Sequence, residues 1–307
     1  MHVVTLLPSA TEIVAALGVD PVGTSHECDH PPGVADGPDI TSTRIDAAAS
    51  SESIDQQVAQ ADSGDGVYEI DADLLERLDP DLIVTQGICD VCAVDTVLVE
   101  RVVEELDLDA EVLTTDPHHL EDLYEDVERI GAALGRDEAA DELIAEFRDR
   151  VSAVEAAVGP IEERPSVAIL DWMDPVMVAG HWMPELVEIA GGQYPLAEPG
   201  DRSTPREWDL VLEADPDVLV AAPCGFDLDQ TRSNLGDLAD RDGWSGLRAV
   251  RAGRSYAMDG HHYVNRPGPR LIDTLEHLAA TLHPGRFDVP PADVVRPMSE
   301  LIAPNRL

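Results

Sequence analysis

Two stretches of this sequence, LERLDPDLIV (residues 75–84) and LEADPDVLV (residues 212–220), share one pattern: a helix end, an Asp-Pro-Asp turn and an apolar run. Proline cannot continue a helix, and a short apolar run after a turn is typical of a buried strand. The triplets begin at Asp79 and Asp215, 136 residues apart. A second repeat, a strand followed by two adjacent histidines, spans 111–119 and 255–262. Together the repeats predict two similar α/β lobes.

The segments around these repeats alternate between short apolar runs and helical stretches, a pattern typical of parallel sheets with helical crossovers. We interpret Ser9-Ala10-Thr11-Glu12 as the cap of the first helix. The predicted strands are 2–7, 21–25, 67–70, 82–85, 111–114, 166–171, 218–222 and 254–258. The predicted helices are 9–17, 71–78, 94–106, 119–134, 137–158, 183–190, 205–213 and 269–282.

The helix predicted over 137–158 is long and amphipathic, and it contains no glycine. We expect it to be a rigid connection between two Rossmann-like lobes, with a ligand cleft between them. The predicted boundaries are an N-terminal lobe at 1–117, a helical linker at 118–162 and a C-terminal lobe at 163–283. Residues 284–307 are rich in proline and are expected to form a tail that packs or frays.

The charge balance excludes several classes of protein. The 307 residues include 62 acidic and 20 basic side chains, all of the latter arginine, for a formal net charge of −42. Without lysine the chain has neither a P-loop nor a Schiff-base lysine. Nucleic acids and anionic membrane surfaces require a basic face, so neither is an expected partner. No apolar run reaches the roughly 18 residues of a membrane-spanning helix.

The same composition predicts a dependence on salt. An acidic, lysine-free chain with 4% aromatic residues resembles proteins of halophiles that accumulate salt. Repulsion among its charges is screened over ~30 Å at 0.01 M salt but only ~3 Å at 1 M. We therefore expect a halophilic protein whose fold tightens as salt rises.

The first residues of the chain give an expectation of where in the cell the protein is located. Met1 and His2 lead directly into VVTLLPSATEIVAALG, without a charged leader, a cleavage site or twin arginines. As written, the chain is expected in the cytoplasm. It would belong to the cell envelope if the true start lies upstream.

Ligands of open α/β sheets bind beyond the carboxyl ends of the strands, so the loops that follow the strands hold the candidate site. Trp172 and Trp182 can flank a flat ring or simply pack in their lobe, and Arg266 can pair with a ligand anion or form a structural salt bridge. Ser9 and Thr11 belong to a helix terminus that can cap itself or donate to an anion. The ligand-binding candidates are Ser9, Thr11, His26, Glu27, Cys28, Gln86, Cys89, Cys92, Trp172, Met173, Trp182, Cys224, Tyr263 and Arg266.

All four cysteines fall in these loops. Cys28, Cys89, Cys92 and Cys224 are too few for a disulfide scaffold, but they offer up to four soft metal ligands, with His26 and His181 as additions. Three alternatives are direct contact with a chelated ligand, a disulfide between Cys89 and Cys92, and small apolar side chains that line the cleft.

Six segments together resemble the helical-backbone (class III) substrate-binding proteins, and most of all their cobalamin-binding branch. The shared segments are LPSATEIVAALG (7–18), PVGTSHECDHPP (21–32), LLERLDPDLIVTQGICDVCAV (74–94), AGHWMPELVEIAGG (179–192), ADPDVLVAAPCGFD (214–227) and NRPGPRL (265–271). The resemblance spans about residues 2–283. It implies two lobes, a bridging helix and a planar metal chelate held in the cleft.

The resemblance also implies a function without catalysis. The expected ligand is cobalamin or another corrinoid, for uptake or intracellular handling, with haem and iron-siderophores as alternatives. An ABC importer permease is the implied partner, docked through acidic loops in which Asp95 and Asp227 are the candidates. The rival hypothesis is a metallochaperone or redox enzyme with a protein-bound metal ion at the Cys/His rim. The sequence lacks GxSxG, GxGxxG after a strand and HExxH, so it does not favour an enzyme.

Overall fold

The computed structural model describes residues 1–34, 37–62, 67–88, 94 and 96–302. Its contacts divide the chain into two compact units. Unit 1 comprises Met1–Asp46, Gln56–Pro117 and Glu121–Phe147, and unit 2 comprises Ala47–Asp55, His118–Leu120 and Arg148–Leu307. The last boundary falls inside helix α6 (Asp137–Val158), so this helix contributes to both units.

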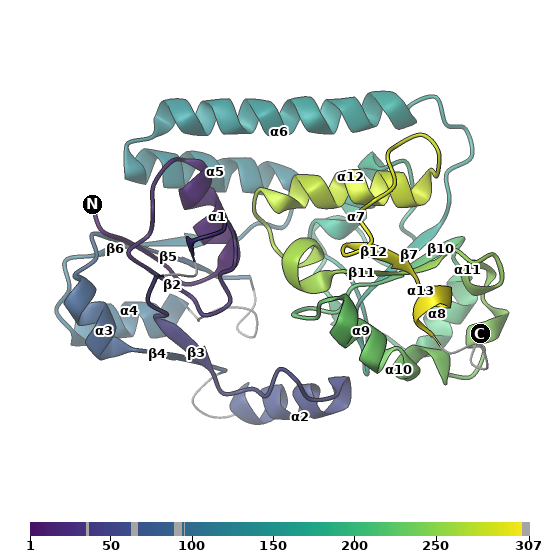
Figure 1. The fold of residues 1–307 in the computed structure, drawn as a ribbon, viewed down its shortest axis with the longest axis horizontal. Coiled ribbons are helices and arrows are strands. Elements are labelled where there is room, and N and C mark those ends of the chain that lie inside the picture. The colour runs from purple at the N-terminus through teal and green to yellow at the C-terminus, as the bar shows by residue number, and fades with distance from the viewer. Residues whose placement is uncertain (35–36, 63–66, 89–93, 95, 303–307) are drawn as a thin grey trace. The chain divides into compact units, whose positions relative to one another are not determined.

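Unit 1 is built on a four-stranded parallel sheet in the order β2-β1-β5-β6 (Figure 1). The strands are β1 (Val3–Thr5), β2 (Gly23–Thr24), β5 (Leu82–Gln86) and β6 (Glu111–Thr115). Every residue of β1 and β5 is buried, as expected for strands covered on both faces. A separate antiparallel pair joins β3 (Thr41–Thr43) to β4 (Tyr68–Ile70).

The helices of unit 1 bury apolar side chains against this sheet. They are α1 (Pro8–Ala16), α3 (Ala72–Leu78), α4 (Thr96–Glu105) and α5 (Leu120–Leu134), whose first residue lies in unit 2. The division of the chain also cuts α2 (Ser51–Asp62). One core cluster comprises Val4, Leu6, Ile40, Leu75, Ile83, Val94 and Val99.

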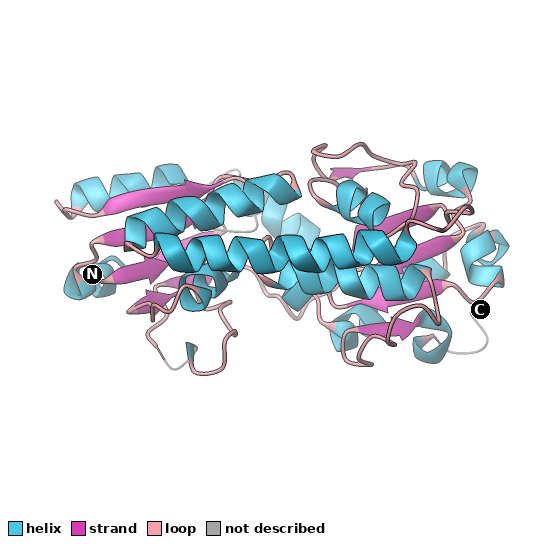
Figure 2. Cartoon of the chain, turned by 90° about the horizontal axis from the view of Figure 1, so that it is seen from above, coloured by secondary structure: helices cyan, strands magenta, loops and turns pink. Residues whose placement is uncertain are grey.

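Unit 2 has a six-stranded mixed sheet in the order β12-β11-β10-β7-β8-β9. The central strands β7 (Val167–Met173), β10 (Val218–Ala221) and β11 (Ser255–Met258) are parallel. They are flanked by the antiparallel strands β8 (Val176–Val178), β9 (Thr204–Pro205) and β12 (Val295–Pro297). Figure 2 shows the strands side by side within each unit, with helices packed over them.

Helices α7 (Met183–Ile189), α8 (Trp208–Ala214) and α12 (Arg270–Leu282) belong to unit 2. Shorter turns are α9 (Leu228–Asn234), α10 (Gly236–Ala239), η2 (Trp244–Gly246), α11 (Arg248–Arg251), the π-helical turn η3 (Gly260–Val264) and α13 (Met298–Leu301). Arg150 of α6 forms ion pairs with Asp273 at 2.5 Å and Glu276 at 2.7 Å, which attach this end of α6 to α12. Within the described ranges, no helix is long and apolar enough to cross a membrane.

The Asp-Pro-Asp repeat has the same structural role in both units. Its first aspartates, Asp79 and Asp215, end α3 and α8 in the left-handed conformation, with φ of 45° and 38°. Its last aspartates accept hydrogen bonds from the backbone of the residue before the neighbouring strand. Asp81 accepts from His2 N at 2.6 Å, and Asp217 accepts from Ser166 N at 2.9 Å. The repeat therefore connects a helix end to two adjacent parallel strands, which confirms the prediction of two similar α/β halves.

Replacing Asp217 by alanine should destabilise unit 2 by about 1–2 kcal/mol, because a charge-assisted hydrogen bond to a strand terminus is lost. The Asp217 carboxylate also accepts from the Ser166 hydroxyl at 3.0 Å and pairs with Arg248 at 2.7 Å. Thermal unfolding of Asp217→Ala, compared with Glu163→Ala at an exposed acidic position, checks this. Equal melting temperatures for the two variants would contradict the assigned role.

Several predicted elements need correction. The first helix begins at Pro8 with Leu7 as its N-cap and no side-chain cap, so the interpretation of Ser9–Glu12 as a cap is wrong. Proline is already suited to the first helical position, which explains why no hydroxyl cap is used. The strand predicted at 21–25 is only Gly23–Thr24, and the helix predicted at 205–213 begins at Trp208. The proline-rich tail adds β12 to the sheet beside β11.

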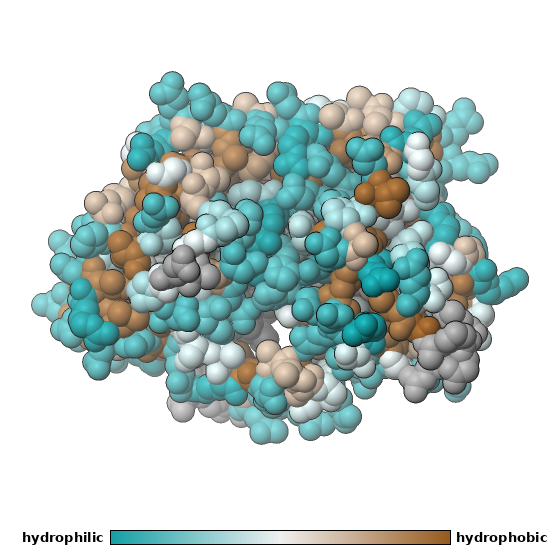
Figure 3. Space-filling view, in the orientation of Figure 1, coloured by the Kyte–Doolittle hydropathy of each residue, from teal (hydrophilic) through white to brown (hydrophobic). Residues whose placement is uncertain are grey.

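Hydrophilic residues cover most of the face shown in Figure 3, and apolar residues appear there as separate patches. Because the net charge is −42, we expect the melting temperature to rise as potassium chloride is increased from about 0.1 M to about 3 M. Potassium chloride suits this test because it screens charge and is only weakly excluded from the protein surface, so a rise in melting temperature reports mainly on screening. A melting temperature that stays flat over this range would contradict the expectation.

Candidate functional site

The strands of unit 1 run parallel, so the loops after β1, β2 and β5 leave the same edge of the sheet. Six predicted site residues lie at or just beyond these strand ends within the described part of the chain: Ser9 and Thr11 in α1, His26, Glu27 and Cys28 in the loop after β2, and Gln86 at the end of β5. Cys89, Cys92 and Asp95 lie outside the described residues, so their predicted roles stay predictions.

Thr11 and Cys28 meet beneath this edge. The Thr11 hydroxyl lies 3.0 Å from Cys28 Sγ and 2.6 Å from the hydroxyl of Thr5, and it also donates to Leu7 O. Thr11 and Cys28 are both buried, as is Ser9. The contact between Thr11 and Cys28 links α1 to the loop after β2.

His26 occupies the part of the edge beyond β2. Its Nδ1 lies 2.9 Å from the Thr41 hydroxyl, and its Nε2 lies 3.3 Å from a carboxylate oxygen of Glu27. The imidazole also lies against Tyr68, with ring centroids 5.9 Å apart. Gln86, the last residue of β5, is buried. The structure therefore brings His26 and Glu27 together as a polar pair.

In unit 2 the carboxyl ends of β7, β10 and β11 form the corresponding edge, called here the unit 2 edge. Trp172 is 9% exposed and packs against Phe226 with ring centroids 5.2 Å apart. Its indole Nε1 donates to Asp174 O at 3.1 Å. The amide of Cys224 donates to Asp171 O at 2.9 Å, which joins the loop after β10 to the end of β7. Trp172 thus lies at the end of β7, next to the loop after β10 that carries Cys224.

Arg241 holds the turn after β7 in place. Its Nη2 donates to Met173 O and to a carboxylate oxygen of Asp174, both at 2.9 Å. The guanidinium also lies 5.8 Å from the centroid of the Trp208 ring. Met173 itself is fully buried. Sequence reasoning did not identify Arg241, because it lies 68 residues further along the chain than Met173.

The loop after β11 contributes Tyr263 and Arg266. Tyr263 packs against His277 with ring centroids 5.5 Å apart, and the Arg270 guanidinium lies over its ring at 5.7 Å. Burial raises the pKa of the Tyr263 hydroxyl. Arg266 is buried, and its Nη2 lies 3.1 Å from His261 Nε2. Trp182, also buried, donates from Nε1 to Val264 O at 3.1 Å and so stabilises this loop.

Asp171 is a buried carboxylate at the unit 2 edge. Burial raises its pKa from 3.8 to about 6, although a hydrogen bond with the Ser203 side chain acts in the opposite direction. Its Oδ1 has no hydrogen-bond partner among the described residues. Asp171 lies where the register of β7 against β8 shifts, between Leu170 and Trp172. Asp171 follows a run of apolar residues in β7, and for this reason it was not predicted as a site residue.

The predicted metal ligands are only partly described. Cys28 belongs to unit 1 and Cys224 to unit 2. In the part of the chain that the structure describes, no group of three or more His, Cys, Asp or Glu side chains is arranged to hold a metal ion. Asp227, a docking candidate, caps α9 by accepting from Gln230 N at 2.8 Å. Its docking role stays a prediction.

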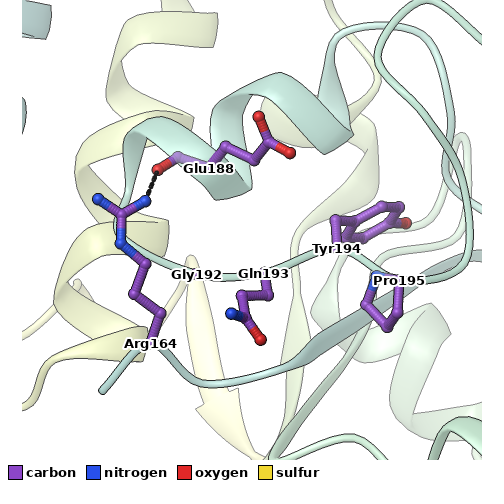
Figure 4. A pocket seen from close by; sticks show the side chains of 6 residues that line it. All are labelled: Arg164, Glu188, Gly192, Gln193, Tyr194 and Pro195. Carbon is purple, nitrogen blue, oxygen red and sulfur yellow. Dashed lines mark hydrogen bonds between the residues drawn. The ribbon is translucent and has the colours of Figure 1, made fainter. Parts of the chain in front are cut away.

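A shallow pocket lies at the other end of β7 (Figure 4). The backbone of Gln193 pairs there with Pro165 and Val167, at the start of the strand. Arg164 donates to Glu188 O at 3.5 Å, close to the end of α7. The predicted ligand-binding residues lie at the opposite end of β7, so this pocket is separate from the unit 2 edge.

Each of the two α/β units has parallel strands whose end loops carry polar and aromatic side chains, an arrangement that suits the binding of a small molecule. The sequence model of the family described as "Periplasmic binding protein" matches residues 3–261, and the chain belongs to this family. Members are the substrate-binding components of ABC transporters, which bind a small molecule and work with a permease; they are not enzymes.

Two curated relatives refine this similarity. The chain is 23% identical over 291 residues to "Uncharacterized ABC transporter substrate-binding lipoprotein YvrC" of Bacillus subtilis, covering 93% of this chain and 81% of that protein. It is 27% identical over 168 residues to "Cobalamin-binding protein" of Halobacterium salinarum, covering 53% of this chain and 44% of that protein.

Solved structures show the same fold. A periplasmic heme binding protein from Pseudomonas aeruginosa has a TM-score of 0.71 at 20% identity, with 96% of each chain covered. The periplasmic vitamin B12 binding protein BtuF of Vibrio cholerae has a TM-score of 0.66 at 18% identity, with 92% of this chain and 96% of that chain covered. At these identities the similarity shows the two-lobed fold and leaves the ligand open.

Proposed function

We propose that this protein binds a metal chelate, most specifically cobalamin or another corrinoid, at the strand-end loops, and presents it to an ABC importer permease. The observation that carries the proposal is the aromatic composition of the unit 2 edge. Trp172 and Phe226 pack together there, and Tyr263 lies on the loop after β11. Large aromatic surfaces with a few polar groups suit a flat ring system with a polar periphery. The similarity to a cobalamin-binding protein supports the choice of a corrinoid.

Replacing Trp172 by alanine should weaken cobalamin binding about tenfold or more, because an aromatic contact surface of the ligand is lost. Isothermal titration calorimetry measures the affinity, and we expect one cobalamin per chain. The matched control is Trp208→Ala, since Trp208 lies on α8 and stacks on Trp244. Equal losses in the two variants would contradict a direct role for Trp172.

A panel of ligands tests the choice of chelate. Titration with cobalamin, haem and a ferric siderophore should give the highest affinity for cobalamin. A higher affinity for haem or for the siderophore would assign the protein to that ligand instead. Proteins of the same fold include a heme-binding protein and a possible iron-binding protein. The absence of binding to any chelate, with zinc or iron retained after dialysis, would favour the rival metal-site function. In that case Cys89→Ser combined with Cys92→Ser should release the metal.

The proposed permease partner predicts where in the cell the protein is found. If the protein serves an importer, it should be found in the cell envelope. If it handles the corrinoid inside the cell, it should be found in the cytoplasm. Fractionation of the native host with an antibody to the protein distinguishes the two locations.

A further inference from the structure

The indole of Trp172 is held in place through the turn that connects β7 to β8. This turn consists of Asp174 and Pro175, which follow the last residue of β7 and precede the first residue of β8. Trp172 Nε1 donates to Asp174 O at 3.1 Å, so the position of this carbonyl determines the orientation of the ring. Only 9% of Trp172 is exposed. A small rotation of the ring therefore changes most of the surface that a ligand can contact.

Arg241, which follows α10, fixes the turn from a distant part of the chain. Its Nη2 donates to Met173 O and to Asp174 Oδ1, both at 2.9 Å, and its Nε donates to Asp237 O at 2.7 Å. Because the guanidinium is a rigid planar fork, it cannot move without breaking one of these bonds. It lies 5.8 Å from the Trp208 ring centroid, near the outer limit of about 6 Å for a cation–π contact, so the hydrogen bonds are what hold it.

The other side of the indole is fixed independently of Arg241. Trp172 packs against Phe226, with ring centroids 5.2 Å apart and an angle of 59° between the ring planes. Phe226 is 2% exposed, and its carbonyl accepts from Gly260 N and His261 N, both at 3.0 Å. The Trp172 ring thus lies between an immobilised neighbour and a hydrogen bond whose acceptor is held by Arg241. Loss of Arg241 would release only the second of these constraints.

We propose that Arg241 is the positioning residue for Trp172 in ligand binding: it holds the acceptor of the indole N–H so that the exposed part of the ring meets the bound chelate in one orientation. The inference rests on the proposed function, because it requires that Trp172 contacts the ligand. Arg241 itself acts through the turn and not on the ligand. A purely structural arginine would stabilise unit 2 without any effect on the affinity, and this difference makes the two roles separable.

A double-mutant cycle with cobalamin as the ligand tests the proposal. Arg241→Ala should weaken cobalamin binding by about threefold to tenfold, as expected when residues that act together are uncoupled. In the Trp172→Ala background the same replacement should have no further effect, because no indole is left to orient. Calorimetric titration measures the four affinities at a temperature at which every variant is folded. An equal loss in both backgrounds would overturn the inference, because Arg241 would then act on the affinity by another route.

The matched control is Arg248→Ala. Arg248 also pairs with two aspartates of unit 2, Asp215 at 3.3 Å and Asp217 at 2.7 Å, but these lie before β10, at the opposite end of the strands. Its replacement should leave the affinity for cobalamin unchanged. A loss of affinity as large as that of Arg241→Ala would contradict a specific effect on Trp172.

A conservative variant keeps the test decisive if Arg241→Ala fails to fold. Arg241→Lys retains the charge but has a single donor nitrogen, which cannot reach Asp237 O and the turn together, so it should show a smaller loss that also disappears without Trp172. If Trp172→Ala weakens binding and neither Arg241 variant does, the inference is overturned and the proposed function stands. Failure of cobalamin to bind the wild-type protein would instead overturn the proposed function.

Discussion

Gly260→Ala is expected to destabilise unit 2 by about 3 kcal/mol and to abolish corrinoid binding. A Cβ at this position would lie 2.2 Å from Pro223 O and 2.6 Å from Ala222 O, both of them backbone atoms. The loop cannot retreat at low cost, because Gly260 N donates to Phe226 O at 3.0 Å and Asn265 bridges Ala222 O and Gly260 O. The two loops at the ends of β10 and β11 must therefore separate. Urea denaturation and calorimetric titration measure the two effects.

The matched control for this variant is Gly246→Ala. Nothing lies within 4 Å of a Cβ built at Gly246, so the unfolding free energy should stay close to that of the wild type. If Gly260→Ala were as stable as Gly246→Ala, the close approach of the two loops would be wrong. If it were destabilised but still bound cobalamin normally, the site would not depend on these loops.

Asp171→Asn is expected to stabilise the protein at neutral pH and to change its pH dependence. The folded pKa of Asp171 is raised from 3.8 to about 6 by burial, so the folded state binds more protons than the unfolded state between these values. Stability from this group is therefore full below about pH 3.8 and is lost as the pH rises through about 6. The difference between these two pKa values corresponds to roughly 3 kcal/mol of unfolding free energy. The wild type should lose this stability as the pH rises, and Asp171→Asn should not.

The measurement is the difference in unfolding free energy between Asp171→Asn and the wild type, taken at about pH 4 and about pH 8. Other titrating groups cancel in this difference. It should increase by roughly 3 kcal/mol toward the higher pH. Asp229→Asn, with a side chain that is 85% exposed, should give a difference that hardly changes. A constant difference for Asp171→Asn would show that its carboxylate is not isolated from solvent in the folded state.

The sequence predicted the central elements of the fold well, because their signals are strong and local. The fully buried β5 and β10 follow Asp-Pro-Asp turns, and α6 was predicted over its observed range of Asp137–Val158. Elements that depend on neighbours were missed. Strands β8 and β9 are two or three residues long and form by pairing with β7 and with each other. Helix α2 has little apolar content, so its periodicity was too weak to detect.

For the candidate site, the sequence predicted which loops lie near one another but gave less information about individual side chains. The rule that ligands bind beyond parallel strand ends predicted that the loops after the parallel strands leave the same edge of each sheet, and they do so in both units. The sequence could not indicate which side chains point inward, and so Thr11 and Cys28 emerged as a buried pair. The two histidines after β11 were noticed as a repeat, but the hydrogen bonds between Asp259 and His262 were not predicted, because the intervening turn was not predicted to be helical.

The short strand β12 has a consequence for association between molecules. It covers the outer edge of β11, which would otherwise offer a row of unpaired amides and carbonyls to another chain. Strand β12 is itself a poor template, because it has three residues, one of them Pro297, which has no amide to donate, and another Arg296, which carries charge. The proline-rich C-terminal segment thus protects the sheet from edge-to-edge aggregation. We expect removal of residues 295–302 to expose the edge of β11 and to increase aggregation more than it affects the ligand site.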